Sequence, residues 1–229
     1  MPKRVAMRVM ALLALATAIF SARYLVFARP LFVLPILLDT FASDEGRAVL
    51  GVAPYLFDHR RVLLLTHISC GIVALILGPL QFIGTKRQRA HRVLGRVYVS
   101  AVAIGSISGL PLSLRILDAI PPALRTSFYA VVAGFATLSI AWPIVTAIAF
   151  AKIRQRRFDE HRAWMIRSYA LTFGAVSVRF LAMPYLLLTR DPLLSITLAI
   201  CGWPLNLIVA EWLIRRTAFR TVVAKAAAF

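Results

Sequence analysis

Apolar residues in this chain form long blocks that are separated by short polar segments. Each block has about 20 residues, the length at which an α-helix crosses the hydrocarbon core of a bilayer. A soluble domain would instead alternate short apolar and polar stretches along each element. We therefore predict an all-α, polytopic membrane helix bundle of about six spans, at residues 5–27, 62–83, 97–116, 127–151, 163–188 and 193–214.

The basic residues predict how these spans are oriented. Lys and Arg collect in the cytoplasmic loops of membrane proteins, close to the ends of the spans. With the N-terminus inside, basic residues in the inner segments outnumber those in the outer segments by more than two to one. We expect both termini in the cytoplasm (N-in/C-in), with the chain in the cytoplasmic (inner) membrane. Its partners are then the bilayer and, at the cytoplasmic face, anionic lipids.

The blocks divide the chain into three regions. Residues 1–60 hold a signal-anchor helix and an outer loop, 61–214 a five-helix membrane core, and 215–229 a basic cytoplasmic tail. A cleaved signal peptide is the alternative for the first helix, but its cleavage pattern of small residues is poor, which favours an uncleaved anchor. The outer segment 28–61 is expected to be the longest loop, and its apolar stretch 30–38 is too short to span.

Composition narrows the classes of function. Of the 229 residues 60% are hydrophobic, and mean hydropathy is +0.80. The net charge of +18 would indicate nucleic acid in a soluble protein. Here no basic segment is long enough to form a domain, so we expect no nucleic-acid partner. The two cysteines lie inside apolar blocks, and no Walker, dinucleotide-binding or HExxH motif is present. Protein partners and enzymatic activity stay open.

Polar side chains within the predicted spans fall into two groups at opposite ends. Polar residues inside membrane helices usually face the bundle interior or a cavity, which makes both groups candidate binding residues. The outer group is His67 and Arg179, at depths of roughly 9 and 15 Å from the outer end. The inner group consists of Gln81, His91, Tyr98, His161, Arg167, Asn206 and Glu211.

Small residues follow one face of the second and third spans, which lets membrane helices pack closely. Gly71 and Gly78 lie on this stripe in the second span, and Tyr98, Gly105 and Gly109 lie on it in the third. Both stripes are predicted to face the bundle interior. Tyr98 also fits the aromatic belt at the membrane surface, as a second interpretation.

Several short segments recur in a recognisable order. They read HISCG from His67, GPLQF from Gly78, HRVLGRVY from His91 and HRAWMIRSY from His161, and WPLN followed by Glu211 closes the series. Together they resemble a bacterial family of predicted membrane proteins, the domain of unknown function 2306, over roughly residues 60 to 213. The resemblance implies a multi-span helical membrane protein and brings no reaction or catalytic residues.

His91 and His161 are the candidate metal ligands, for haem iron. Both are expected at the inner membrane face, and each is followed by Arg. Two histidines at one depth on facing helices can ligate a b-type haem, and arginines can pair with its propionates. A His-Arg pair at a helix start is also a common interfacial anchor. A two-haem relay is disfavoured, because His67 has only His59 as an outer companion, on what is expected to be the same helix.

The remaining polar residues have two interpretations each. His67 and Arg179 either fix helix packing through interior hydrogen bonds or line an outer pocket for a quinone or another polar head group. Arg179 has no acid at its own depth, so its expected partner is a carbonyl, an outer-loop Asp or a ligand. Glu211 is expected to pair with Arg167 or Arg215, with proton transfer as the functional alternative.

Two classes of function follow. In the first, a redox or accessory protein binds haem b or a quinone through its interior His and Arg residues. In the second, the same polar interior serves a carrier of small solutes or lipids, and a structural subunit of a membrane complex is a further alternative. Transporters are often built from internal repeats, and the chain has no convincing one. The first class is therefore favoured.

Overall fold

A computed structural model of the chain describes residues 2–26, 44–83, 88–182, 185, 200 and 202–217. The α-helices are α1 (Pro2–Val26), α3 (Asp44–His59), α4 (Arg61–Ile83), α5 (Gln88–Leu114), α6 (Arg125–Arg154), α7 (Phe158–Thr172), α8 (Gly174–Ser177) and a C-terminal helix at residues 202–217. Two 3₁₀ turns, η1 (Arg115–Ala119) and η2 (Pro122–Leu124), and a π-helix, η3 (Val178–Ala182), complete the described part. It contains no strand, which confirms the predicted all-α membrane bundle.

Within the described residues, four helical segments are long and apolar enough to cross a bilayer: Met7–Val26, Arg61–Phe82, Arg89–Ala119 and Pro122–Arg154. They coincide with the first four predicted spans. Their large exposed apolar side chains, such as Leu12, Ile107 and Ile144, face outward from the bundle, as lipid-facing residues do. The fifth and sixth predicted spans correspond to α7–η3 and to the C-terminal helix, and much of the segment between them lies outside the described residues.

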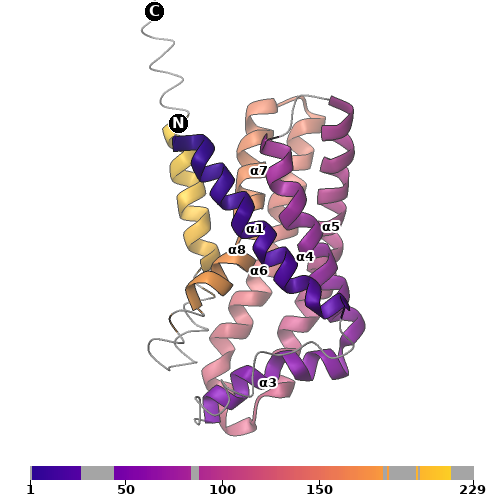
Figure 1. Cartoon of the computed structure of the whole chain (residues 1–229), viewed down its shortest axis with the longest axis vertical. Coiled ribbons are helices and arrows are strands. Elements are labelled where there is room, and N and C mark those ends of the chain that lie inside the picture. The colour runs from indigo at the N-terminus through magenta and orange to yellow at the C-terminus, as the bar shows by residue number, and fades with distance from the viewer. Residues whose placement is uncertain are drawn as a thin grey trace, which may run out of the picture.

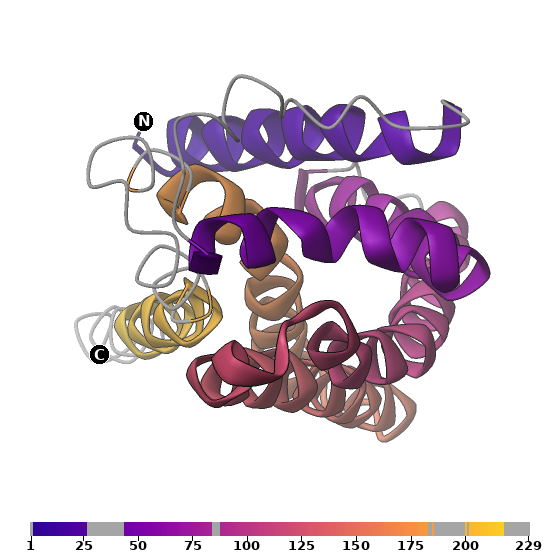
Figure 2. The ribbon, with the colours of Figure 1, turned by 90° about the horizontal axis from the view of Figure 1, so that it is seen from below.

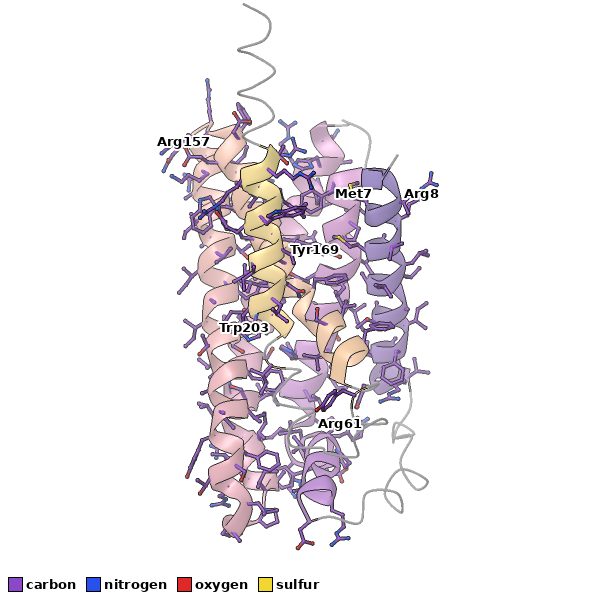
Figure 3. The ribbon with its side chains drawn as sticks, turned by 90° about the vertical axis from the view of Figure 1, so that its left-hand side faces the viewer. Met7, Arg8, Arg61, Arg157, Tyr169 and Trp203 are labelled. Carbon is purple, nitrogen blue, oxygen red and sulfur yellow. The ribbon has the colours of Figure 1, made fainter. Side chains whose placement is uncertain are left out.

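Consecutive helices pack side by side along the bundle (Figure 1): α4 lies against α5, α5 against α6 and α6 against α7. Helix α1 packs on α4 through a narrow face of small residues that includes Ala14 and Ala18. We call the end that holds the N-terminus the inner end, and the end that holds α3 the outer end. Arg8 and Arg157 both lie toward the inner end (Figure 3), and the C-terminal helix also ends there (Figure 1).

Helix α3 was predicted as part of a loop, and this prediction was wrong. It lies across the outer end of the bundle (Figures 1 and 2). Its buried residues Ala48, Leu56 and Phe57 cover that end, and its neighbours are η1 and α4. Pro54 within the helix, together with its mixed composition, hides it in the sequence. The apolar stretch 30–38 lies outside the described residues.

The fifth span is broken rather than continuous. Helix α7 ends at Thr172, Phe173 forms a turn, and α8 then leads into the π-helix η3. At the break a Cβ on Gly174 would lie 3.0 Å from Cβ of Trp203, so the C-terminal helix approaches closely there.

The small-residue stripe of the third span faces the interior, as predicted, and so does Gly78 in the second span, whereas Gly71 has open space beside it. A Cβ added to Gly78 would overlap the Tyr169 ring, and one added to Gly109 would lie 2.7 Å from Nδ1 of His67. A Cβ on Gly105 would likewise touch Cys70 and Trp142. These contacts let α4, α5, α6 and α7 pack at short distances, where many van der Waals contacts form.

A network of hydroxyl groups fills the centre of the bundle. The Tyr98 hydroxyl lies 2.9 Å from Oγ of Ser168 and 2.8 Å from Oγ1 of Thr172. Trp142 Nε1 donates to the Thr172 hydroxyl at 2.9 Å, and Thr146 and Ser168 lie 2.6 Å apart. Tyr98 has an exposed fraction of 0%. Its interpretation as an aromatic-belt residue was therefore wrong, since the hydroxyl finds its partners on α7 and not in the head-group layer.

Candidate functional site

A cavity of about 670 Å³ lies at the inner end, where the last turns of α4 and α6 meet the first turns of α5 and α7. This volume falls within the range of roughly 300–1,000 Å³ that is usual for ligand pockets. We call it the inner cavity. Its lining residues are Gln81, Phe82, His91, Arg92, Gly95, Arg96, Val99, Phe150, Ile153, Arg154, His161, Arg162 and Met165.

The inner cavity combines positive charge with apolar walls. Arg92, Arg96, Arg154 and Arg162 line it, and none of its lining residues, all of which belong to the described part of the chain, is acidic. Phe82, Phe150 and Met165 contribute apolar surface. Such a site favours a molecule with a flat or elongated apolar body and a negatively charged end, since arginine forms paired hydrogen bonds with carboxylates and phosphates.

His91 and His161 come from different helices and line this same cavity. The Nδ1 atom of His161 lies 2.8 Å from the carbonyl oxygen of Ala149 on α6. A carbonyl only accepts hydrogen bonds, so Nδ1 is the donor, and in the neutral ring Nε2 then keeps its lone pair. A backbone hydrogen bond of this kind commonly orients a metal-binding histidine. His91, on the first turn of α5, is exposed.

Gln81 is a third predicted residue that lines the cavity. It lies in the last turn of α4, and its side-chain nitrogen Nε2 is buried without a hydrogen-bond partner in the described structure. A buried amide donor that lacks a partner costs roughly 1–3 kcal/mol. A ligand with a carbonyl or carboxylate oxygen in the cavity would accept this hydrogen bond.

Glu160, in the first turn of α7, forms ion pairs and does not line the cavity. Glu160 pairs with Lys152 at 2.8 Å and also with Arg157. The hydrogen bond from Lys152 is the largest cause that holds the pKa of the Glu160 carboxyl below its usual range, and the charge of Arg157 adds to it. Because Lys152 and Arg157 neutralise this carboxylate, the positive charge of the cavity arginines is not cancelled by it.

Three of the predicted inner residues lie outside the cavity lining and connect the C-terminal helix to α7. Arg167 donates to Glu211 through Nε and Nη2, at 3.0 and 2.7 Å, and Arg215 donates to the same carboxylate at 3.2 Å. This confirms the expected pairing of Glu211. The Asn206 amide receives a hydrogen bond from Ser177 at 3.0 Å and donates one to the Ala170 carbonyl at 3.2 Å. These contacts, like those of Tyr98, join neighbouring helices, so helix packing accounts for the presence of these polar residues.

The outer pair also occupies defined positions. His67 lies 2.8 Å, through Nδ1, from the carbonyl oxygen of Gly105 on α5. Arg179 donates from Nη1 to the Ala175 carbonyl at 2.7 Å, so its partner is one of the expected kinds. His59 ends α3 and stacks on Tyr55, with ring centroids 4.2 Å apart. His59 and His67 therefore belong to two different helices, α3 and α4, and the expectation that they share one helix was wrong.

Some lining residues were missed as site residues. Arg96, Arg154, Met165 and Phe150 belong to the cavity, yet their sequence signals are those of loop charges and ordinary apolar span residues. Only the meeting of four helix ends brings them together. The spacing of Arg92 and Arg96, one helical turn apart on α5, is the one local signal that two positive charges share a face.

In a comparison with known families, residues 64–214 match the family described as "Predicted membrane protein (DUF2306)". The chain belongs to this family. The DUF2306 segment contains every residue that lines the inner cavity, as well as His67, Arg179 and the Arg167–Glu211 pair. No curated protein and no solved structure matches the chain.

Proposed function

We propose that this membrane protein is a redox or accessory protein of the bacterial cytoplasmic membrane, and that it binds haem b in the inner cavity. The observation that carries the proposal is the convergence of His91 and His161, from α5 and α7, on one cavity surrounded by arginines. Two histidines on separate helices are the ligand pair of b-type haems, and the haem supplies one-electron redox chemistry when bound.

The other cavity residues fit the rest of a haem. Its two propionates would pair with arginines such as Arg92 and Arg162, which line the cavity beside the histidines. Phe82, Phe150 and Met165 would contact the apolar face of the macrocycle. The hydrogen bond of His161 to Ala149 would hold that imidazole in the tautomer in which Nε2 binds iron.

A quinone is the second candidate, and Gln81 favours it. A quinone carbonyl would accept a hydrogen bond from the buried Nε2 of Gln81, and its ring would lie between the apolar walls. A quinone carries no charge and leaves the four arginines without a role, so haem is the better match. A carrier of small solutes or lipids would use the same cavity without a tightly bound cofactor.

The decisive experiment is a reduced-minus-oxidised absorbance spectrum of the purified protein, expressed with ample haem. We expect a b-type spectrum that His91→Ala and His161→Ala each abolish. His59→Ala is the matched control, because that histidine is exposed at the outer end. Absence of any haem band in wild type, including after titration with haemin, refutes the haem proposal. The Gln81→Leu variant then tests the quinone through its effect on bound quinone extracted from the protein.

The same proposal includes the orientation of the chain. We place the inner end in the cytoplasm, with six spans in all, so that exposed arginines such as Arg92 and Arg154 meet anionic lipids of the inner leaflet. The common location of the N-terminus and of the end of the C-terminal helix supports an even number of spans (Figure 1). A reporter that is active only in the cytoplasm, fused to the C-terminus, should be active. An inactive fusion beside an active periplasmic one contradicts this map.

A further inference from the structure

The turn that joins α6 to α7 concentrates exposed side chains at the inner end of the bundle, where Figure 3 labels Arg157. We call five of its exposed residues the turn surface: Arg154, Arg156, Arg157, Phe158 and Arg162. Arg154 and Arg162 also line the inner cavity, so the two sites adjoin each other. The described segments 89–96 and 152–162 together hold eight basic residues and two acidic ones. The inner end therefore presents a strongly positive surface around the cavity.

Arg156 occupies a backbone position that favours glycine. Its φ is 58°, in the left-handed region, directly after the C-cap residue of α6. The N–H groups of Arg156 and Arg157 donate to the carbonyls of Ile153 and Lys152, both at 3.0 Å. This is the Schellman arrangement, in which glycine is usual because a Cβ costs free energy in the left-handed conformation. The turn itself gives no reason for an arginine here, whereas a positively charged binding surface does.

Phe158 adds an exposed aromatic ring to the same turn. It is the first residue of α7, and 66% of it is exposed. Phe158 and Arg162 are four residues apart, so they share one face of the helix. Aromatic residues and arginine are enriched in protein–protein interfaces, where a few of them carry most of the binding energy. The turn surface has this composition.

The position of the turn surface along α6 favours a water-soluble partner over a lipid. The large exposed apolar side chains of α6 extend from Tyr129 to Phe150. This stretch covers roughly 32 Å, close to the thickness of about 30 Å of a hydrocarbon core. Arg154 lies roughly 6 Å beyond Phe150, and Arg156 follows it in the turn. Because a head-group layer is only about 5–7 Å thick, the turn surface reaches the aqueous phase.

We propose that the turn surface binds an acidic, water-soluble protein. Phe158 is the apolar anchor, and the arginines pair with carboxylates of the partner. The docked protein then lies next to the inner cavity, because Arg154 and Arg162 belong to both sites. The class of partner rests on the function proposed above: with haem in the cavity, it is a one-electron carrier with an iron–sulfur or flavin group. The reduced carrier loses one electron, and the ferric haem iron gains it.

The test measures equilibrium binding of three purified carriers to the full-length protein in nanodiscs of phosphatidylcholine, a lipid without net charge. Plant-type ferredoxin and flavodoxin are the acidic probes, and cytochrome c is a basic carrier of similar size. We expect saturable binding of an acidic probe that weakens as salt is raised, and no binding of cytochrome c. An absorbance spectrum of the same sample reports bound haem.

Two variants of the turn surface test which residues bind the partner. We expect Phe158→Ser to weaken the affinity about tenfold and Arg156→Gly about threefold. Neither residue lines the inner cavity, so both variants should keep the haem spectrum of the wild type. Glycine suits the left-handed turn, so Arg156→Gly should unfold at or above the wild-type midpoint while it binds more weakly. Arg115→Gln, at the outer end, is the matched charge control.

The possible results separate docking from the alternatives. Absence of saturable binding by both acidic probes overturns the proposal, and so does unchanged affinity in folded Arg156→Gly and Phe158→Ser. Insertion of the turn into the bilayer is tested with Phe158→Trp, and quenching of its added fluorescence by brominated phosphatidylcholine overturns the proposal. Binding of an acidic probe to a protein without haem contradicts only the haem proposal, whereas a haem spectrum without binding contradicts only the docking proposal.

Discussion

The hydroxyl network predicts that Tyr98 holds α5 and α7 together rather than binding a ligand. Its hydroxyl makes two contacts, to Ser168 and Thr172, and both partners keep other hydrogen bonds when it is removed. Tyr98→Phe therefore leaves no buried donor unsatisfied. Hydrogen bonds between membrane helices contribute about 0.6 kcal/mol each on average. Loss of both contacts should lower the free energy of unfolding by roughly 1 kcal/mol.

The size of the loss in the free energy of unfolding distinguishes the contribution of the Tyr98 hydroxyl from that of its buried ring. Tyr98→Ala also removes the buried ring, and should cost about 3–5 kcal/mol. Tyr129→Phe is the matched control, since Tyr129 is 56% exposed and should change stability by less than about 0.5 kcal/mol. The assay is reversible unfolding by sodium dodecyl sulfate in mixed micelles, followed by circular dichroism.

Two results would refute this reasoning. One is a Tyr98→Phe variant as stable as the wild type, which would mean that the hydroxyl contributes nothing to packing. The other is a loss of haem or quinone binding in Tyr98→Phe at full stability, which would restore the residue to the binding site. A double-mutant cycle with Thr172→Val should give a coupling energy of about 0.5 kcal/mol or more, because the two side chains are in direct contact.

Two further predictions concern close packing and pH. Gly78→Ala would place a methyl group within the volume of the buried Tyr169 ring and should cost about 1–3 kcal/mol in the same unfolding assay, whereas Gly71→Ala, with no atom within 4 Å of the new methyl, should be neutral or slightly stabilising. Because the pKa of Glu160 is held below its usual range, its ion pairs stabilise the fold above the unfolded pKa of about 4.3 and are lost as the pH falls through the folded value. The thermal unfolding midpoint of the wild type should therefore fall as the pH is lowered through the folded pKa of Glu160. The Glu160→Gln variant should lose this contribution to the fall, and the Asp159→Asn variant should keep it.

The sequence predicts best those parts of the fold that depend on local composition. The first four spans are uniformly apolar, so their existence and approximate ends follow from length alone. Helix α3 could not be predicted, because contacts with η1 and α4 stabilise it in spite of Pro54. The break at Phe173 was hidden as well, since the residue packed closely at Gly174 is Trp203, which comes from a helix distant in the sequence.

The candidate site residues were also predicted only in part. The depths of His91, His161 and Gln81 placed them at one end of the bundle, and the inner cavity brings them together. Depth alone did not separate these residues from Arg167, Asn206 and Glu211. Which side of a helix faces the cavity depends on the neighbouring helices, and these are distant in the sequence.

The middle of the bundle has a consequence for how the protein responds to voltage. Between its two cationic ends, the described central turns of α1, α4, α5 and α6 contain no Lys, Arg, Asp or Glu, and hydroxyls and amides provide the polar contacts there. Moving one elementary charge through a membrane potential requires about 2.3 kcal/mol per 100 mV. Rearrangements of this central layer displace no formal charge, so they carry almost no gating charge. Rearrangements confined to these central turns should accordingly proceed alike in energised and de-energised membranes.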